Sequence, residues 1–172
     1  MTIKIGIVEF GRIAEHHSAA ISAHPDLALD CVCELDPNRR LTATAKTNTV
    51  YESLGDLLAE NPSREIDWII ICTPSGAHYN HAKQCIDKGY NILLEKPPTM
   101  KSAQLKHLLA LADDKNLCII PIFQNRFNTA WRKASELISS GVLGDFRFAT
   151  LTKYWHRPQR YYDMSPWRGT MA

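Results

Sequence analysis

The chain has 172 residues, enough for one domain, or for one domain and part of a second. Its formal net charge of +2 is too small to indicate binding to nucleic acid or to an anionic membrane surface. No apolar run approaches the ~20 residues that a membrane helix needs, and an apolar strand begins at Ile3, which leaves no room for a signal peptide.

Apolar runs alternate with helical patterns along the chain. Runs typical of buried strands are Ile3–Val8, Leu27–Cys33, Thr49–Tyr51, Ile66–Cys72, Asn91–Leu94 and Leu117–Phe123, followed by a longer alternating strand at Phe146–Tyr154. Helices are predicted at about 12–23, 36–46, 53–58, 77–88, 102–115 and 130–140. This alternation predicts an α/β fold, a Rossmann-type doubly wound parallel sheet.

The cysteines and histidines do not form a metal site in the sequence. Five cysteines occur, at Cys31, Cys33, Cys72, Cys85 and Cys118. They lack metal-ligand spacing, and all but Cys85 lie in predicted apolar strands, which favours reduced thiols in a cytoplasmic protein. His78 and His81 lie one helical turn apart, but no third ligand accompanies them. We therefore predict no metal.

The first strand, turn and helix have the pattern of a dinucleotide-binding unit. Such units use a G-x-G-x-x-G/A turn to bring a helix N-terminus under a pyrophosphate. Here the three slots are Glu9, Gly11 and Ala14, so the first glycine is replaced. Glu34 ends the second strand, where a carboxylate accepts hydrogen bonds from a ribose and favours NAD over NADP. The alternative is a solvated loop acid.

Two arginines, Arg39 and Arg40, follow Glu34 and leave NADP open as a cofactor, although an ordinary charged helix face is the alternative. Glu9 also has two interpretations. Its side chain either points away from the cofactor, or it places a carboxylate beside the pyrophosphate. Two like charges ~4 Å apart repel by about 4 kcal/mol at an effective dielectric of ~20, roughly a thousandfold in affinity. We therefore expect Glu9 to weaken dinucleotide binding.

Polar residues converge at the carboxyl ends of the predicted strands, where open α/β sheets bind ligands. They are Glu9–Gly11, Glu34, Thr73–His78, Glu95–Lys96 and Gln124–Arg126. This convergence indicates a ligand site more strongly than a glycine-rich turn alone.

Several motifs resemble those of the Gfo/Idh/MocA oxidoreductases, the group of glucose–fructose oxidoreductase and inositol dehydrogenase. They are Gly11-Arg12-Ile13-Ala14 with His17, Thr73-Pro74 with His78, Glu95-Lys96-Pro97, Gln124-Asn125-Arg126-Phe127, and a late set at Arg157-Pro158-Gln159, Tyr161-Tyr162-Asp163 and Trp167-Arg168-Gly169. The late set is most similar to members that oxidise sugars or nucleotide sugars.

The resemblance implies a dinucleotide-binding Rossmann domain over residues 1–123. Residues 124–172 would then form a linking helix and only the beginning of the family's second α+β domain. Family members continue into a larger second half, which supplies an aspartate/histidine motif whose histidine acts as acid/base. We therefore expect this chain to be inactive or incomplete by itself.

The same resemblance implies functions for individual residues. Cofactor contacts are expected from Phe10, Gly11, Arg12, Ile13, Glu34, Thr73, Pro74, His78 and Glu95. Substrate contacts are expected from Lys96, Asn125, Arg126, Trp155, Arg157 and Tyr161. Lys96 is the expected catalytic residue, because a lysine beside the nicotinamide can orient the alcohol oxygen and ease loss of its proton. Glu95 is its expected charge partner.

The sequence thus predicts an NAD(P)-dependent oxidoreductase that acts on a sugar, cyclitol or nucleotide sugar by hydride transfer. The alternative is a non-catalytic dinucleotide-binding or protein-interaction remnant of that family. The aromatic and basic residues from Trp155 onward are interpreted as a sugar-binding loop, or as an exposed patch that favours a homo-oligomer. We expect no nucleic-acid partner and no membrane partner, because the charges nearly balance.

Overall fold

The computed structural model describes residues 1–60, 66–145, 147–165 and 167–170, in two compact units that divide after Ile122. The first unit contains β1 (Ile3–Val8), α1 (Arg12–Ser22), β2 (Leu27–Cys33), α2 (Pro37–Thr44), β3 (Thr49–Tyr51), α3 (Leu54–Glu60), β4 (Trp68–Ile71), η1 (Ser75–Ala77), α4 (His78–Asp87), β5 (Asn91–Leu94), α5 (Ser102–Asp114) and β6 (Ile119–Pro121). The second contains η2 (Gln124–Phe127), α6 (Thr129–Ser139) and α7 (Gln159–Asp163).

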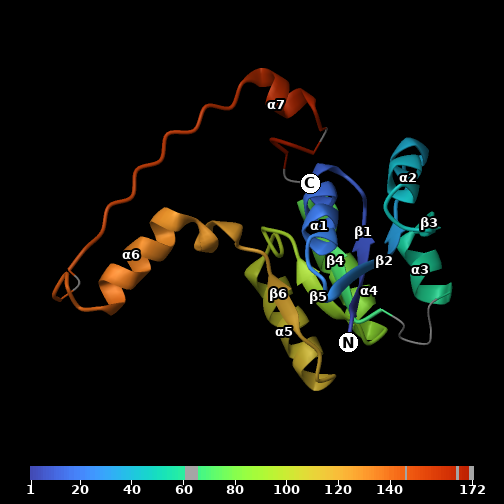
Figure 1. Ribbon diagram of the computed structural model, residues 1–172, viewed down its shortest axis with the longest axis horizontal. Coiled ribbons are helices and arrows are strands. Elements are labelled where there is room, and N and C mark those ends of the chain that lie inside the picture. Colours follow the sequence, from blue (N-terminus) through green and yellow to red (C-terminus); the bar gives the residue numbers. More distant parts are fainter. Residues whose placement is uncertain (61–65, 146, 166, 171–172) are drawn as a thin grey trace. The chain divides into compact units, whose positions relative to one another are not determined.

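The first unit is built on one sheet with the strand order β3-β2-β1-β4-β5-β6, and every neighbouring pair is parallel. Figure 1 shows β3 with α2 and α3 at one edge of this sheet, and β6 with α5 at the other. The predicted doubly wound α/β sheet is therefore confirmed. The strand order reverses between β1 and β4, so the fold places its ligand crevice at the carboxyl ends of these two strands.

Helices cover both faces of the sheet, because the strands present apolar side chains to each side. Ile7 packs in one layer with residues of α1 and α2, such as Ala14 and Ala43. Val8 faces the opposite layer, with Leu57 from α3, Ile86 from α4 and further residues of α5. Burying each large aliphatic side chain contributes roughly 1.5–3 kcal/mol. These two layers fix the positions of the strand ends.

Local signals set several of the helix boundaries. The Asp36 side chain accepts hydrogen bonds from the backbone N–H groups of Asn38 and Arg39, at 2.8 and 3.1 Å, and starts α2 beside Pro37. Ser53 Oγ accepts from Asp56 N at 3.2 Å and starts α3, as predicted. Both caps stand directly after strands, so they also fix the loops at the ligand edge.

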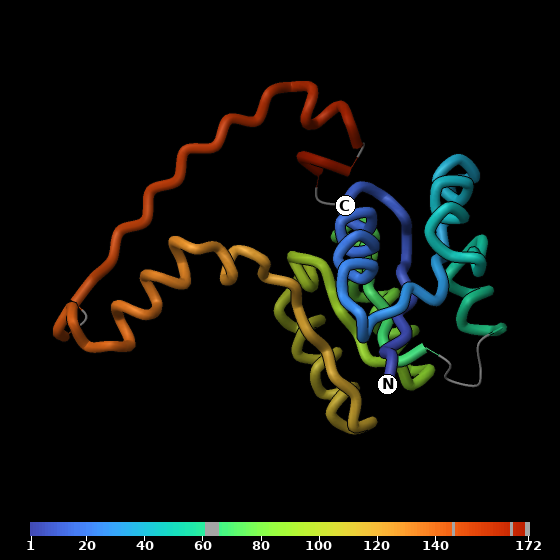
Figure 2. The backbone as a smooth tube through the Cα atoms, in the orientation of Figure 1, coloured from blue at the N-terminus to red at the C-terminus, as the bar shows by residue number. Residues whose placement is uncertain are grey.

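In the second unit, η2 precedes α6, and residues 147–158 form neither helix nor strand before α7 begins, as Figure 2 traces. The strand predicted at Phe146–Tyr154 is wrong for the residues described: residues 147–154 form no strand, and Phe146 lies outside the described part. Alternating side chains favour a strand only where another strand supplies ladder partners. Here Phe148, Leu151 and Tyr154 are exposed, so no packed face holds such a strand.

Candidate functional site

The turn after β1 leads into the N-terminus of α1, which has no side-chain cap. Gly11 precedes the first residue of α1. A Cβ atom on Gly11 would meet only Arg39 Nη1, at 4.0 Å. Ala14 is fully buried against the sheet, which holds the helix close. Uncapped N–H groups at a helix N-terminus can bind a phosphate, and Gly11, Arg12 and Ile13 lie at this helix N-terminus.

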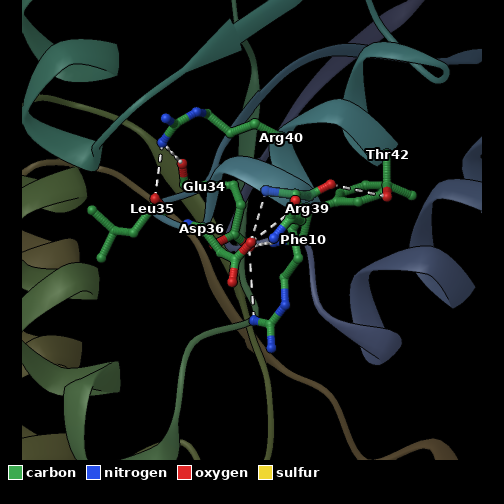
Figure 3. A network of polar contacts seen from close by, with 8 residues as sticks. Phe10, Glu34, Leu35, Asp36, Arg39, Arg40 and Thr42 are labelled. Carbon is green, nitrogen blue, oxygen red and sulfur yellow. Dashed lines mark hydrogen bonds and ion pairs between the residues drawn. The ribbon is translucent and has the colours of Figure 1, made fainter.

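Glu34 lies directly after β2 and is 2% exposed. Its Oε2 accepts from the backbone N–H of Phe10 at 2.7 Å, and its Oε1 accepts from Asp36 N at 2.8 Å (Figure 3). A buried carboxylate needs such donors. Glu34 therefore ties the turn after β1 to the loop after β2, a structural role that the sequence did not reveal. Each carboxylate oxygen can accept more than one hydrogen bond, so contact with a ribose remains open to it.

The two arginines of α2 differ in their contacts. Arg40 donates to the carbonyl oxygens of Glu34 and Leu35, at 3.1 and 2.9 Å, and lies 3.4 Å from a carboxylate oxygen of Glu52. Arg39 is half exposed, with Nη1 4.0 Å from Glu34 Oε2, as Figure 3 shows. Arg40 is thus committed to the protein, whereas Arg39 faces the edge where the ligand is expected.

Glu9 adopts the left-handed conformation that a glycine would take at this slot, with φ 64°. Its N–H donates to the Cys33 carbonyl at 2.8 Å, so the backbone turn still forms. The pKa of Glu9 is raised to about 7, mainly because the side chain is buried and also because the charge of Glu34 lies nearby, while the charge of Arg39 partly opposes the rise. The side chain is partly buried at the ligand edge, so the structure retains the turn and places a carboxyl group there.

A cavity of about 220 Å³ opens beside the Glu9 turn. Its lining residues come from the ends of β1 and β2 and from α3 and α4, and include Glu9, Glu34, Glu52, Leu54 and His81. Burial lowers the pKa of His81, and the nearby His78 lowers it further. Three carboxyl groups make this cavity unfavourable for an anion while they are charged.

Thr73 lies directly after β4 and is 6% exposed. Within the described part of the chain, its buried Oγ1 has no hydrogen-bond partner. Such orphaned hydroxyls are uncommon, and a bound ligand can supply the missing partner. Thr73 and Pro74 stand across the switch point from Gly11, so the residues present fit a dinucleotide there. His78 is 1% exposed and contacts backbone carbonyls, which places it behind this turn.

Glu95 ends β5 and contacts His17 on α1. His17 Nε2 lies 2.9 Å from Glu95 Oε1, and Lys96 N donates to Glu95 Oε2 at 3.1 Å. Burial raises the pKa of Glu95, but the hydrogen bonds from His17 and Lys96 outweigh it and lower the pKa below the ordinary value. The positive charge of Lys96 also lowers the pKa of Glu95, as expected of a charge partner, and His17 is a hydrogen-bonded side-chain partner that was not expected. The Lys96 side chain is exposed at this edge.

Five predicted substrate residues, Asn125, Arg126, Trp155, Arg157 and Tyr161, belong to the second unit. Within that unit, the Arg157 guanidinium lies 3.9 Å from the Trp155 ring centroid and 4.1 Å from that of Tyr161. The Arg126 guanidinium lies 5.5 Å from the Phe123 ring. Their assignment to a substrate site stays a prediction.

Among the residues that the structure describes, no group of three or more His, Cys, Asp or Glu side chains is placed to bind a metal ion. Cys31, Cys33, Cys72 and Cys85 are buried free thiols, whereas Cys118 is exposed just before β6 rather than buried in a strand. In the same described part, none of the helices combines the length and apolarity that crossing a bilayer requires.

Residues 3–123 match the family described as an oxidoreductase family with an NAD-binding Rossmann fold, GFO_IDH_MocA. The chain belongs to the Gfo/Idh/MocA family. The WlbA dehydrogenase from Bordetella pertussis, solved in complex with NADH and UDP-GlcNAcA, is 30% identical with a TM-score of 0.93, covering 99% of this chain and 52% of that one. The scyllo-inositol dehydrogenase from Lactobacillus casei, solved with NAD(H) and scyllo-inositol, is 27% identical with a TM-score of 0.77, covering 84% and 43%.

Curated Gfo/Idh/MocA relatives are longer than this chain. The inositol 2-dehydrogenase of Rhizobium meliloti is 25% identical over 152 residues, which are 88% of this chain and 45% of the relative. The NADP(+)-dependent scyllo-inositol 2-dehydrogenase IolW of Bacillus subtilis is 27% identical over 164 residues, 92% of this chain and 43% of the relative. The chain thus spans less than half the length of these relatives.

Proposed function

We propose that this chain is the dinucleotide-binding half of an NAD(P)-dependent oxidoreductase acting on an alcohol group of a sugar, cyclitol or nucleotide sugar. One observation carries the proposal: the uncapped N-terminus of α1 and the orphaned Thr73 Oγ1 lie at the two strand ends that flank the switch point. Gly11, Arg12 and Ile13 would hold the pyrophosphate, with Glu34 at the ribose. Phe10, Thr73, Pro74, His78 and Glu95 would line the remainder.

Lys96 is the proposed catalytic residue of this half. A nicotinamide cofactor, when bound, supplies the hydride acceptor or donor. The Lys96 ammonium would orient the substrate hydroxyl and stabilise negative charge on its oxygen as the proton leaves. His17 and Glu95 hold the Lys96 backbone, which supports this role. Asn125, Arg126, Trp155, Arg157 and Tyr161 would contact the substrate.

Among the substrate classes, we favour a nucleotide sugar. The similarity to the nucleotide-sugar-bound WlbA structure extends over 99% of this chain, whereas that to the inositol dehydrogenase extends over 84%. NAD is the favoured cofactor, and NADP stays open because IolW uses NADP(+) and Arg39 faces the ligand edge. A cytoplasmic homo-oligomer is also proposed, supported by the four buried free thiols and the exposed Trp155 and Tyr154.

A second candidate is a non-catalytic remnant that no longer binds a dinucleotide well. Glu9 favours it, because the carboxyl group stands in the glycine slot with the charge of Glu34 nearby. The first candidate predicts that the Thr73 hydroxyl forms a hydrogen bond to a bound dinucleotide. The second predicts no such contact.

Two threonine variants test the proposal directly. Thr73→Val should leave the free energy of unfolding unchanged or raise it. It should weaken NADH binding by about 2- to 10-fold, because it removes one hydrogen bond to the cofactor, which contributes about 0.5–1.5 kcal/mol. Thr47→Val is the matched control, because Thr47 Oγ1 donates to Asp30 O at 2.7 Å. The control should lose stability and keep its NADH affinity. Equal NADH affinity in wild type and Thr73→Val would contradict the proposed contact.

A further inference from the structure

The His78 ring joins two backbone segments from different parts of the sheet. Its Nε2 lies 2.8 Å from the carbonyl oxygen of Thr73, in the turn after β4. Its Nδ1 lies 2.7 Å from the carbonyl oxygen of Pro97, in the loop after β5. The residue is 1% exposed, so water has little access to the ring.

Both partners of this ring can only accept hydrogen bonds. A neutral imidazole carries one N–H, so it can donate to one carbonyl and would turn a lone pair toward the other. Two lone pairs at 2.7–2.8 Å repel each other, because no proton lies between them. The geometry is satisfied on both sides only when each ring nitrogen carries a proton.

We propose that His78 is a doubly protonated clamp that joins the turn after β4 to the loop after β5 and thereby positions Lys96. Lys96 directly precedes Pro97, so a fixed Pro97 carbonyl limits the movement of the Lys96 backbone. His17 holds the other side of Lys96 through Glu95. The positioning role rests on the proposed function of Lys96, whereas the protonation state of His78 does not.

Both nitrogens of the buried ring have carbonyl partners, and titratable groups lie on the elements that pack against α4. A buried cation is unfavourable unless it is hydrogen bonded, and both ring nitrogens have carbonyl partners. On the same helix, His81 lies one turn after His78. Helix α4 packs against β4, β5 and α5. The titratable residues that follow β4 and β5 are Cys72, Glu95 and Lys96, and α5 carries Lys106, His107, Asp113 and Asp114. Of these, Glu95 provides a buried carboxylate at the end of β5.

The first test reads the protons of His78 in the wild-type chain. In protein labelled with ¹⁵N-histidine, long-range ¹H–¹⁵N correlation spectra at neutral pH distinguish an imidazolium from the two neutral tautomers. His24 is the internal control, because it is exposed and its Nδ1 accepts a hydrogen bond from Asp26 N at 3.3 Å. The proposal predicts two protonated nitrogens for His78. A single protonated nitrogen would overturn it.

The second test measures how firmly the two segments are held. In His78→Gln, one side-chain nitrogen replaces two, so amide hydrogen exchange around Thr73 and Lys96 should rise about tenfold or more. His107→Gln is the matched control, since His107 is exposed on α5 and pairs with Tyr79. Unchanged exchange in His78→Gln would contradict the clamp. If this variant exchanges faster throughout the chain, the wild-type spectrum decides the question alone.

Titration with NADH separates this inference from the proposed function. An imidazolium at His78 without NADH binding would support the clamp and contradict the proposed function. A neutral His78 with normal NADH binding would contradict the clamp and leave the proposed function standing.

Discussion

His17 Nε2 lies 2.9 Å from Glu95 Oε1, and this contact joins helix α1 to the end of strand β5. Both side chains are largely buried, 19% and 8% exposed, so solvent screens the pair only partly. The same carboxylate accepts from the Lys96 backbone N–H. The proposed pyrophosphate helix and the proposed catalytic lysine are thus joined through two side chains.

We expect His17 and Glu95 to stabilise the fold cooperatively. A double-mutant cycle with His17→Phe and Glu95→Gln, measured by urea denaturation, should give a coupling energy of about 1–3 kcal/mol. Because the folded-state pKa of Glu95 is lowered, its contribution is present above its unfolded value near 4.5 and is lost as the pH falls through the folded pKa. His16→Phe, at the exposed neighbouring position, is the control. Independent effects of the two substitutions would refute the coupling.

Glu34 should be important for stability even without a cofactor. Glu34→Gln replaces one of two buried acceptor oxygens with an NH₂ group, which then faces the backbone N–H of Phe10 or Asp36. The expected loss is about 1–3 kcal/mol in the free energy of unfolding. Glu60→Gln, exposed at the end of α3, should change it by no more than about 0.5 kcal/mol. Comparable losses in the two variants would show that the Glu34 contacts contribute little.

Glu9 should make stability depend on pH. Its folded-state pKa is raised to about 7 from 4.5, so the folded state favours the protonated form. The resulting destabilisation is absent below pH 4.5, grows between the two values, and is complete above about 7. Glu9→Gln should therefore become more stable than wild type across this window, by about 1–2 kcal/mol after allowance for partial exposure. Parallel pH profiles for the two proteins would contradict the raised pKa.

The sequence was sufficient to predict the parallel sheet of the first unit. The six strands of the first unit all appear, because parallel strands covered on both faces read as continuous apolar runs. The predicted strand at Phe146–Tyr154 failed, because its alternation needs partner strands that the described residues do not supply.

The side-chain contacts within the candidate site were harder to predict from the sequence than the strands. Glu34 was expected at the strand end, but its bond to Phe10 depends on the exact path of the turn after β1. His17 was noted as part of a motif, yet its partner Glu95 lies 78 positions later and meets it only through the sheet. The clamp at His78 likewise joins segments that only the fold brings together.

Glu9 is expected to limit the affinity of the proposed dinucleotide site. Calorimetric titration of wild type, Glu9→Gln and Glu9→Gly with NADH and NADPH at pH 8 tests it most directly. Glu9→Gln removes the charge alone, and Glu9→Gly also relieves the positive φ. We predict weak wild-type binding, with Glu9→Gly tighter by about 10- to 1000-fold and Glu9→Gln between them. Equal affinities would show that Glu9 is no obstacle, and an absence of binding in all three would contradict the dinucleotide site itself.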